Sequence, residues 1–146
     1  MADLVEPGIL CGMTSSLARE DQPPVTSLEE ARERVADLVG HAISRQLWLM
    51  LFDAAGRQLP LLIPVGGIPL RPDPGDSVQM ASGITTILAD CAPGGSVVLT
   101  LERPGGAALT APDQAWAREL RASFGKVLPI LGLFVAHDTG VADLAE

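Results

Sequence analysis

Apolar residues along the chain change their spacing several times, and each spacing predicts a type of element. Between Leu28 and Val39 they recur every three or four positions, which predicts an amphipathic helix. Ser27 and Glu30 form a capping box at its start, and Gly40 marks its end. Residues 47–52 are apolar at every position, which predicts a strand covered on both faces. Residues 96–101 and 130–136 are mostly apolar and predict a central strand and a further buried strand.

The first of these strands is predicted to belong to a hairpin. Asp53 to Gly56 has the composition of a tight turn, and residues 57–65 then run back as a second strand. Pro60 and Pro64 lack the backbone N–H that a central strand needs. The return strand is therefore predicted to lie at an edge of the sheet or to be irregular.

Two further helices are predicted on either side of the central strand. The first spans about residues 77–91, with Asp76 or Ser77 as its N-cap and Val78 on its inward face. The second spans about residues 111–126 and is amphipathic in the same way.

The order of these elements, α-β-β-α-β-α-β, indicates an α/β (α+β) fold with helices flanking a mixed β-sheet. Residues 26–146 are predicted to form this single domain. Residues 1–25 are interrupted by Pro and Gly and are predicted to be an irregular N-terminal arm. After the last strand, residues 137–140 are expected to turn into a short closing segment.

The net charge of the chain argues against two classes of binding partner. Ten basic residues against 18 acidic ones give a formal net charge of −8, which argues against nucleic-acid binding and against anionic membranes. No apolar run is long enough to span a membrane and no signal peptide is evident, so we expect a cytoplasmic protein. Cys11 and Cys91 are then expected to be free thiols. The Arg-rich, Lys-poor composition is typical of actinobacterial and other GC-rich bacterial proteins.

Polar residues suited to a site follow the central strand, where α/β folds usually build their active sites. Arg103, Gly105 and Gly106 could cradle a phosphate there. The sequence nevertheless lacks the ending of a P-loop and the third glycine of a dinucleotide fingerprint, so a plain turn is the simpler prediction. Glu102 and Arg103 are predicted to form a surface pair at the end of the strand.

Other candidate residues have structural explanations too. Asp113 lies three residues after Thr110, so the two are predicted to cap a helix rather than to act in catalysis. His137 and Asp138 are adjacent on a predicted solvated turn, and adjacent side chains rarely reach one reacting atom. No catalytic residue, metal site or cofactor is therefore predicted. The candidate ligand-binding residues are Glu102, Arg103, Gly105, Gly106, Asp113 and His137.

Residues 47–144 resemble the JAB/MPN (JAMM) metalloprotease-like family, nearest to its bacterial RadC-type branch. The resemblance is carried by three segments: Phe52-Asp53-Ala54-Ala55-Gly56-Arg57, Leu101-Glu102-Arg103-Pro104-Gly105-Gly106 and Thr110-Ala111-Pro112-Asp113. The family has His-x-His-Pro-x-Gly at the second segment and Pro-Ser-x-x-Asp at the third. The resemblance implies a cytidine-deaminase/JAB-like three-layer sandwich.

The departures from the family pattern concern its metal ligands. Leu101 and Arg103 stand at the two histidine positions, and Asp113 is one position out of register. The strand at residues 47–52 carries no glutamate that could act as the general base. One carboxylate does not hold a catalytic zinc, which takes three protein ligands. The resemblance therefore implies a degenerate, metal-free relative, or pseudoenzyme.

Three functions remain as expectations. The leading one is a non-catalytic binding or assembly module, a homo-oligomer (dimer) or the partner of another protein, with residues 61–74 and the arm as contact surfaces. The second is a small-ligand-binding protein or enzyme that uses the loop from Arg103 to Gly106. The third is a regulatory subunit that acts through its N-terminal arm.

Overall fold

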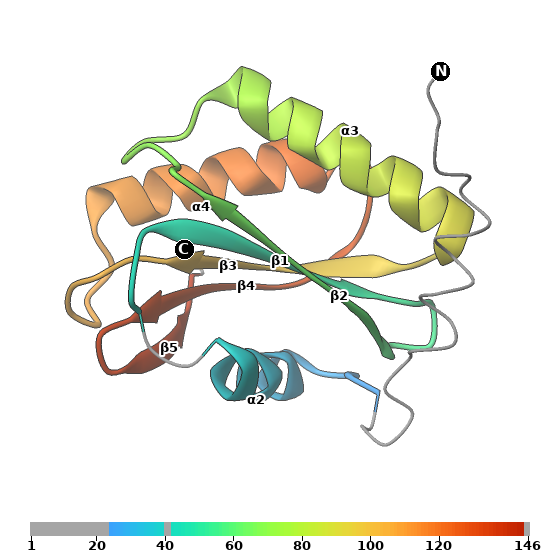
Figure 1. The fold of residues 1–146 in the computed structure, drawn as a ribbon, viewed down its shortest axis with the longest axis horizontal. Coiled ribbons are helices and arrows are strands. Elements are labelled where there is room, and N and C mark those ends of the chain that lie inside the picture. Colours follow the sequence, from blue (N-terminus) through green and yellow to red (C-terminus); the bar gives the residue numbers. More distant parts are fainter. Residues whose placement is uncertain (1–23, 40–41, 145–146) are drawn as a thin grey trace.

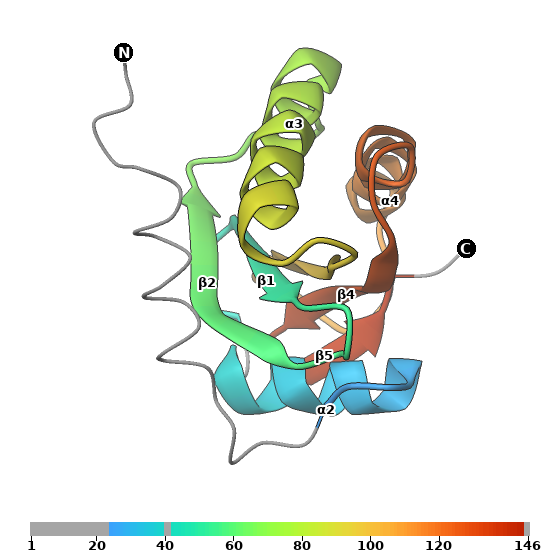
Figure 2. The same cartoon turned by 90° about the vertical axis from the view of Figure 1, so that its right-hand side faces the viewer.

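The computed structural model describes residues 24–39 and 42–144, which form a five-stranded sheet between two layers of helices (Figure 1). Helix α2 (Leu28–Leu38) covers one face of the sheet, and α3 (Pro74–Cys91) and α4 (Ala111–Phe124) cover the other (Figures 1 and 2). The strands are β1 (Gln46–Phe52), β2 (Gln58–Gly66), β3 (Ser96–Glu102), β4 (Ile130–His137) and β5 (Gly140–Asp143). The predicted α/β class and element order are confirmed, and the closing segment is a fifth strand. Among these residues no helix has the length and apolar character needed to cross a membrane.

The strands lie in the order β2-β1-β3-β4-β5. β1 is antiparallel to both of its neighbours, β3 and β4 are parallel, and β5 returns antiparallel to β4. Gln46 pairs with Glu102, which pairs in turn with Ala136. The start of β1 and the carboxyl ends of β3 and β4 therefore meet at one end of the sheet, next to the N-terminus of α4.

Each face of the sheet supports an apolar core. Alternate residues of β1 and β3 point to opposite faces, so a continuously apolar strand fills both cores. The core under α3 and α4 includes Leu47, Leu49, Leu51, Leu99, Leu101, Trp116, Leu120 and Phe124. The core under α2 includes Ala31, Val35, Met50, Phe52, Val98 and Phe134. This double burial confirms the prediction from the apolar runs.

β2 is an outer strand, as its prolines predict. Pro64 lies opposite Trp48 of β1 and, like every proline, has no backbone N–H to donate. Pro60 lies where the pairing register between β1 and β2 shifts, between Met50 and Phe52 of β1. Both prolines are tolerated in β2 because this strand has a neighbouring strand on one side only.

Helix α3 differs from its prediction in two respects. Its N-cap is Asp73, not Asp76 or Ser77, because a proline follows directly and suits the first helical position. The buried stripe continues from Ala81 to Ser77 by a step of four residues. Val78, predicted to face inward, is therefore 57% exposed.

Helix α2 begins where the capping box predicts, but only half of that box forms. The Ser27 hydroxyl accepts a hydrogen bond from the backbone N–H of Glu30 at 3.1 Å. The Glu30 carboxylate instead accepts from the backbone N–H and the hydroxyl of Thr26, both at 2.8 Å. Leu28, predicted to be inward, is half exposed at the start of the helix.

The predicted N-terminal arm lies largely outside the described residues, which begin at residue 24. Val25 is buried in the core under α2, and its N–H donates to the carbonyl of Gly56 at 2.7 Å. Gly56 has φ +86°, and a Cβ there would lie 2.5 Å from the Val25 carbonyl oxygen. Only glycine fits this contact between the chain before α2 and the β1–β2 turn.

Cys91 is the last residue of α3 and is disulfide-bonded. The expectation that it is a free thiol is therefore wrong. Cys11, the other cysteine of the sequence, lies outside the described residues.

Candidate functional site

Arg103 leaves the end of β3 and turns toward the N-terminus of α4, where it meets Asp113. Its Nε lies 3.2 Å from each carboxylate oxygen of Asp113, and its Nη2 lies 2.8 Å from Oδ2. The side chains of Arg103 and Asp113 are only 3% and 1% exposed, so this is a buried, bidentate ion pair. The predicted surface pair of Glu102 and Arg103 is wrong, because successive residues point to opposite faces of the sheet.

The same two side chains also hold the loop between β3 and α4. Arg103 donates from Nη1 to the carbonyl of Gly106 at 2.6 Å and from Nη2 to that of Ala108 at 3.0 Å. Asp113 accepts from the backbone N–H of Thr110 at 2.9 Å, and the Thr110 hydroxyl accepts from that of Asp113 at 3.2 Å. The predicted capping pair is confirmed. The Asp113 carboxylate therefore both caps α4 and pairs with Arg103.

Gly105 is fixed from the other side of the corner by Asp138. Its N–H donates to Oδ1 of Asp138 at 3.0 Å, and the N–H of Asp138 donates to its carbonyl at 2.9 Å. Gly105 adopts φ +120°, a conformation that favours glycine. The Gly105 amide that a phosphate cradle would use is therefore already hydrogen-bonded within the protein.

His137 ends β4 and is 5% exposed, so the prediction of a solvated turn is wrong for this residue. The register of β3 and β4 ends with Glu102 opposite Ala136, and His137 and Arg103 each come next in the chain. The His137 Nδ1 lies 3.3 Å from both the backbone nitrogen and the hydroxyl of Thr139, and the His137 carbonyl accepts from Ala42 at 2.9 Å. These contacts fix the histidine within its own turn, of which Asp138 and Thr139 are the exposed part.

Glu102 points toward the α2 layer, away from Arg103, and is 2% exposed. Its Oε1 accepts from the side chains of Gln46 at 2.8 Å and Trp48 at 2.7 Å. Its Oε2 accepts from the backbone N–H groups of Ile43 at 2.6 Å and Ser44 at 2.9 Å. Four neutral donors thus solvate one buried carboxylate. Sequence reasoning missed all four, since only the register of β1 and β3 brings them to this residue.

The hydrogen bonds determine the charge state of both buried carboxyls. Burial pushes the pKa of Glu102 up, but the donors from Ser44, Ile43, Trp48 and Gln46 outweigh it and leave the pKa below its ordinary value. For Asp113, burial likewise raises the pKa, while Arg103 and Thr110 lower it further than burial raises it. Both groups are therefore carboxylates at neutral pH.

These shifts predict how stability depends on pH. In the unfolded chain the carboxyls of Glu102 and Asp113 protonate near 4.5 and 3.8, and in the folded protein their pKa values are lower. The unfolded state therefore binds protons first. We expect their stabilisation to be complete above about pH 5 and to be lost as the pH falls through the folded pKa values. Urea unfolding at about pH 7, 5, 4 and 3 measures the loss.

The Glu102→Gln variant serves as the comparison for this pH series. It lacks one of the two buried carboxyls whose pKa is lowered, so its stability should fall less steeply with acid than that of the wild type. Equal losses in the two proteins would contradict the role of Glu102.

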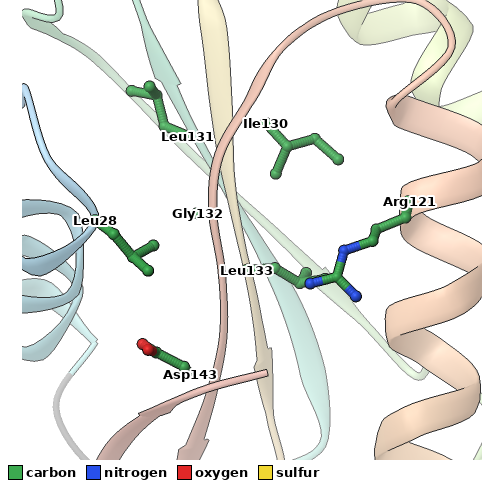
Figure 3. Close-up of a pocket in the computed structure, with 7 residues that line it drawn as sticks. All are labelled: Leu28, Arg121, Ile130, Leu131, Gly132, Leu133 and Asp143. Carbon is green, nitrogen blue, oxygen red and sulfur yellow. The ribbon is translucent and has the colours of Figure 1, made fainter. Parts of the chain in front are cut away.

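Three surface cavities lie away from this corner. One of about 190 Å³ is at the edge of β4 between α2 and α4 (Figure 3). Figure 3 shows Arg121 and Asp143 on opposite sides of the β4 ribbon there. The other two, of about 340 and 220 Å³, lie along α3 and the C-terminal end of α4. None of the three is lined by a candidate ligand-binding residue.

The corner between β3 and α4 is therefore held together by its own hydrogen bonds and ion pair. Its charged and polar groups bond to one another and to the loop backbone. Within residues 24–39 and 42–144, no three His, Cys, Asp or Glu side chains gather in a way that could hold a metal ion. Comparison of the chain with family models, with curated proteins and with solved structures finds no match.

Proposed function

We propose that the protein is a non-catalytic binding or assembly module, with a JAB/MPN-like fold that lacks the zinc site. One observation carries this proposal: the buried ion pair of Arg103 with Asp113 occupies the corner at which the family holds its metal. Arg103 stands at one of the two histidine positions. Leu101 stands at the other and belongs to the apolar core under α3 and α4.

The architecture supports the same proposal. The resemblance implies a three-layer sandwich, and a mixed sheet between two layers of helices supports it. The element order along the chain agrees as well. A fold of this kind without a metal site retains surfaces for binding, and surfaces are what an assembly module uses.

The alternative, a ligand site in the loop from Arg103 to Gly106, is disfavoured by the hydrogen bonding. A ligand would have to displace the Asp113 carboxylate from Arg103, leaving a buried charge without its partner. It would also have to displace Asp138 from the N–H of Gly105. We therefore place binding on the outer surface of the fold, with a second copy or another protein as the partner.

Zinc titration by calorimetry, combined with peptidase and isopeptidase assays, tests the proposal. We expect no stoichiometric zinc binding at micromolar zinc and no turnover. A zinc-dependent member of the JAB/MPN family serves as the positive control for both measurements. Tight zinc binding together with hydrolysis would overturn the proposal.

A further inference from the structure

An apolar groove runs along the outer side of α3 where it meets the end of α4. It consists of the cavities of about 340 and 220 Å³, and both are lined by Thr85 and Val127, so they form one continuous hollow. Val78 and Val127 belong to its wall and are 57% and 48% exposed. Large aliphatic side chains this exposed around an apolar hollow are typical of an interaction surface.

The charge distribution indicates which partner this face suits. Residues 77–89 of α3 include no Asp, Glu, Lys or Arg, and Lys126 is the single charged residue that lines the hollow. The outward face of α2 instead exposes Glu29, Glu33 and Asp37. Two copies of a chain with net charge −8 repel each other through charged faces. The groove is a face on which that repulsion is small.

We propose that this groove is where two copies of the protein meet. The exposed side chains of Val78 and Val127 on one copy enter the hollow of the other, and the contact is repeated by two-fold symmetry. A face that carries both the apolar protrusions and the apolar hollow suits a self-complementary interface. The inference rests on the proposed function as an assembly module and names its partner as a second copy.

The dimensions of the face predict a weak dimer. The 18 residues of α3 span about 27 Å, and a neighbouring helix axis lies about 10 Å away. A face of this length and about 20 Å wide covers on the order of 500 Å² on each copy. A standard stable interface buries about 800 Å² on each partner. We therefore expect self-association with a Kd in the micromolar range, roughly 1–100 µM.

Sedimentation velocity of the full chain, from about 1 µM to about 200 µM, tests the inference. Ser82→Glu places a charge on an exposed position that lines the hollow. Ala36→Glu makes the same change of net charge on the exposed side of α2 and is the matched control. We expect Ser82→Glu to weaken dimerisation at least about tenfold and Ala36→Glu to leave it unchanged. Val127→Ser, which removes an apolar protrusion, should weaken it severalfold.

Each other outcome overturns the inference. A wild-type monomer at the highest concentration removes the dimer, and loss of thermal stability in a monomeric Ser82→Glu variant would place a segment of the same chain in the groove. A dimer that tolerates both Ser82→Glu and Val127→Ser must form elsewhere. None of these results bears on zinc binding, so the proposed function fails or stands by its own experiment.

Discussion

Asp113→Ala is expected to lower the free energy of unfolding by about 3–5 kcal/mol. The substitution leaves the guanidinium of Arg103, whose side chain is 3% exposed, without its carboxylate. It also removes the acceptor for the N–H of Thr110 at the start of α4. Removing one partner of a buried ion pair is costly because the remaining charge stays away from water. Urea unfolding at neutral pH measures the loss.

Two comparisons show whether the buried charge is the cause. Asp138→Ala removes an exposed carboxylate that bonds Gly105 in the same loop, and it should cost no more than about 1 kcal/mol. The double variant Arg103→Met with Asp113→Ala has no stranded charge and should be more stable than Asp113→Ala alone. A double variant less stable than the single one would show that the arginine contributes through its loop contacts instead.

Glu102→Gln is expected to lower the free energy of unfolding by about 2–4 kcal/mol. An amide offers one acceptor oxygen where the carboxylate offers two. Its NH₂ group would face either the donors of Ile43 and Ser44 or those of Gln46 and Trp48. At least two of these donors then lose their acceptor at the buried side chain of residue 102. Unfolding followed by urea at pH 7 measures this effect separately from the acid series.

Glu33→Gln is the matched control for this substitution, since Glu33 is exposed on α2. It makes the same chemical change in water and should alter stability by less than about 0.5 kcal/mol. Equal effects at the two positions would show that the four donors around Glu102 do not depend on its charge.

Much of the fold could be predicted from the sequence because local chemistry determines it. In β1, β3 and β4, apolar residues stand at successive positions and not only at alternate ones. Such strands require a sheet that is covered on both faces. The prolines of β2 required an edge position. Local patterns were weaker where two spacings fitted equally well. Both Ser77 and Val78 continue a helical stripe from Ala81, and packing against the sheet decided between them.

The corner beyond β3 could be located from the sequence, but its chemistry could not be predicted. Adjacent charges such as Glu102 and Arg103 look like a surface pair until their strand has layers on both sides. Once it does, one side chain points into each layer, and each needs its own set of partners. Those partners come from distant segments, such as Trp48 and Asp113, which strand register and helix placement bring together. The burial of His137 was not predicted, for the same reason.

The prolines of β2 affect how the protein associates at high concentration. A bare outer strand recruits strands from other molecules, and that kind of addition repeats without limit into fibrils. Pro60 and Pro64 lie in the outer strand β2, and prolines in an outer strand oppose such addition because they have no N–H to donate. If two copies meet through the groove along α3 instead, the two-fold contact buries the groove of both copies. No groove is then left for a third copy, so assembly stops at a dimer rather than continuing as a filament.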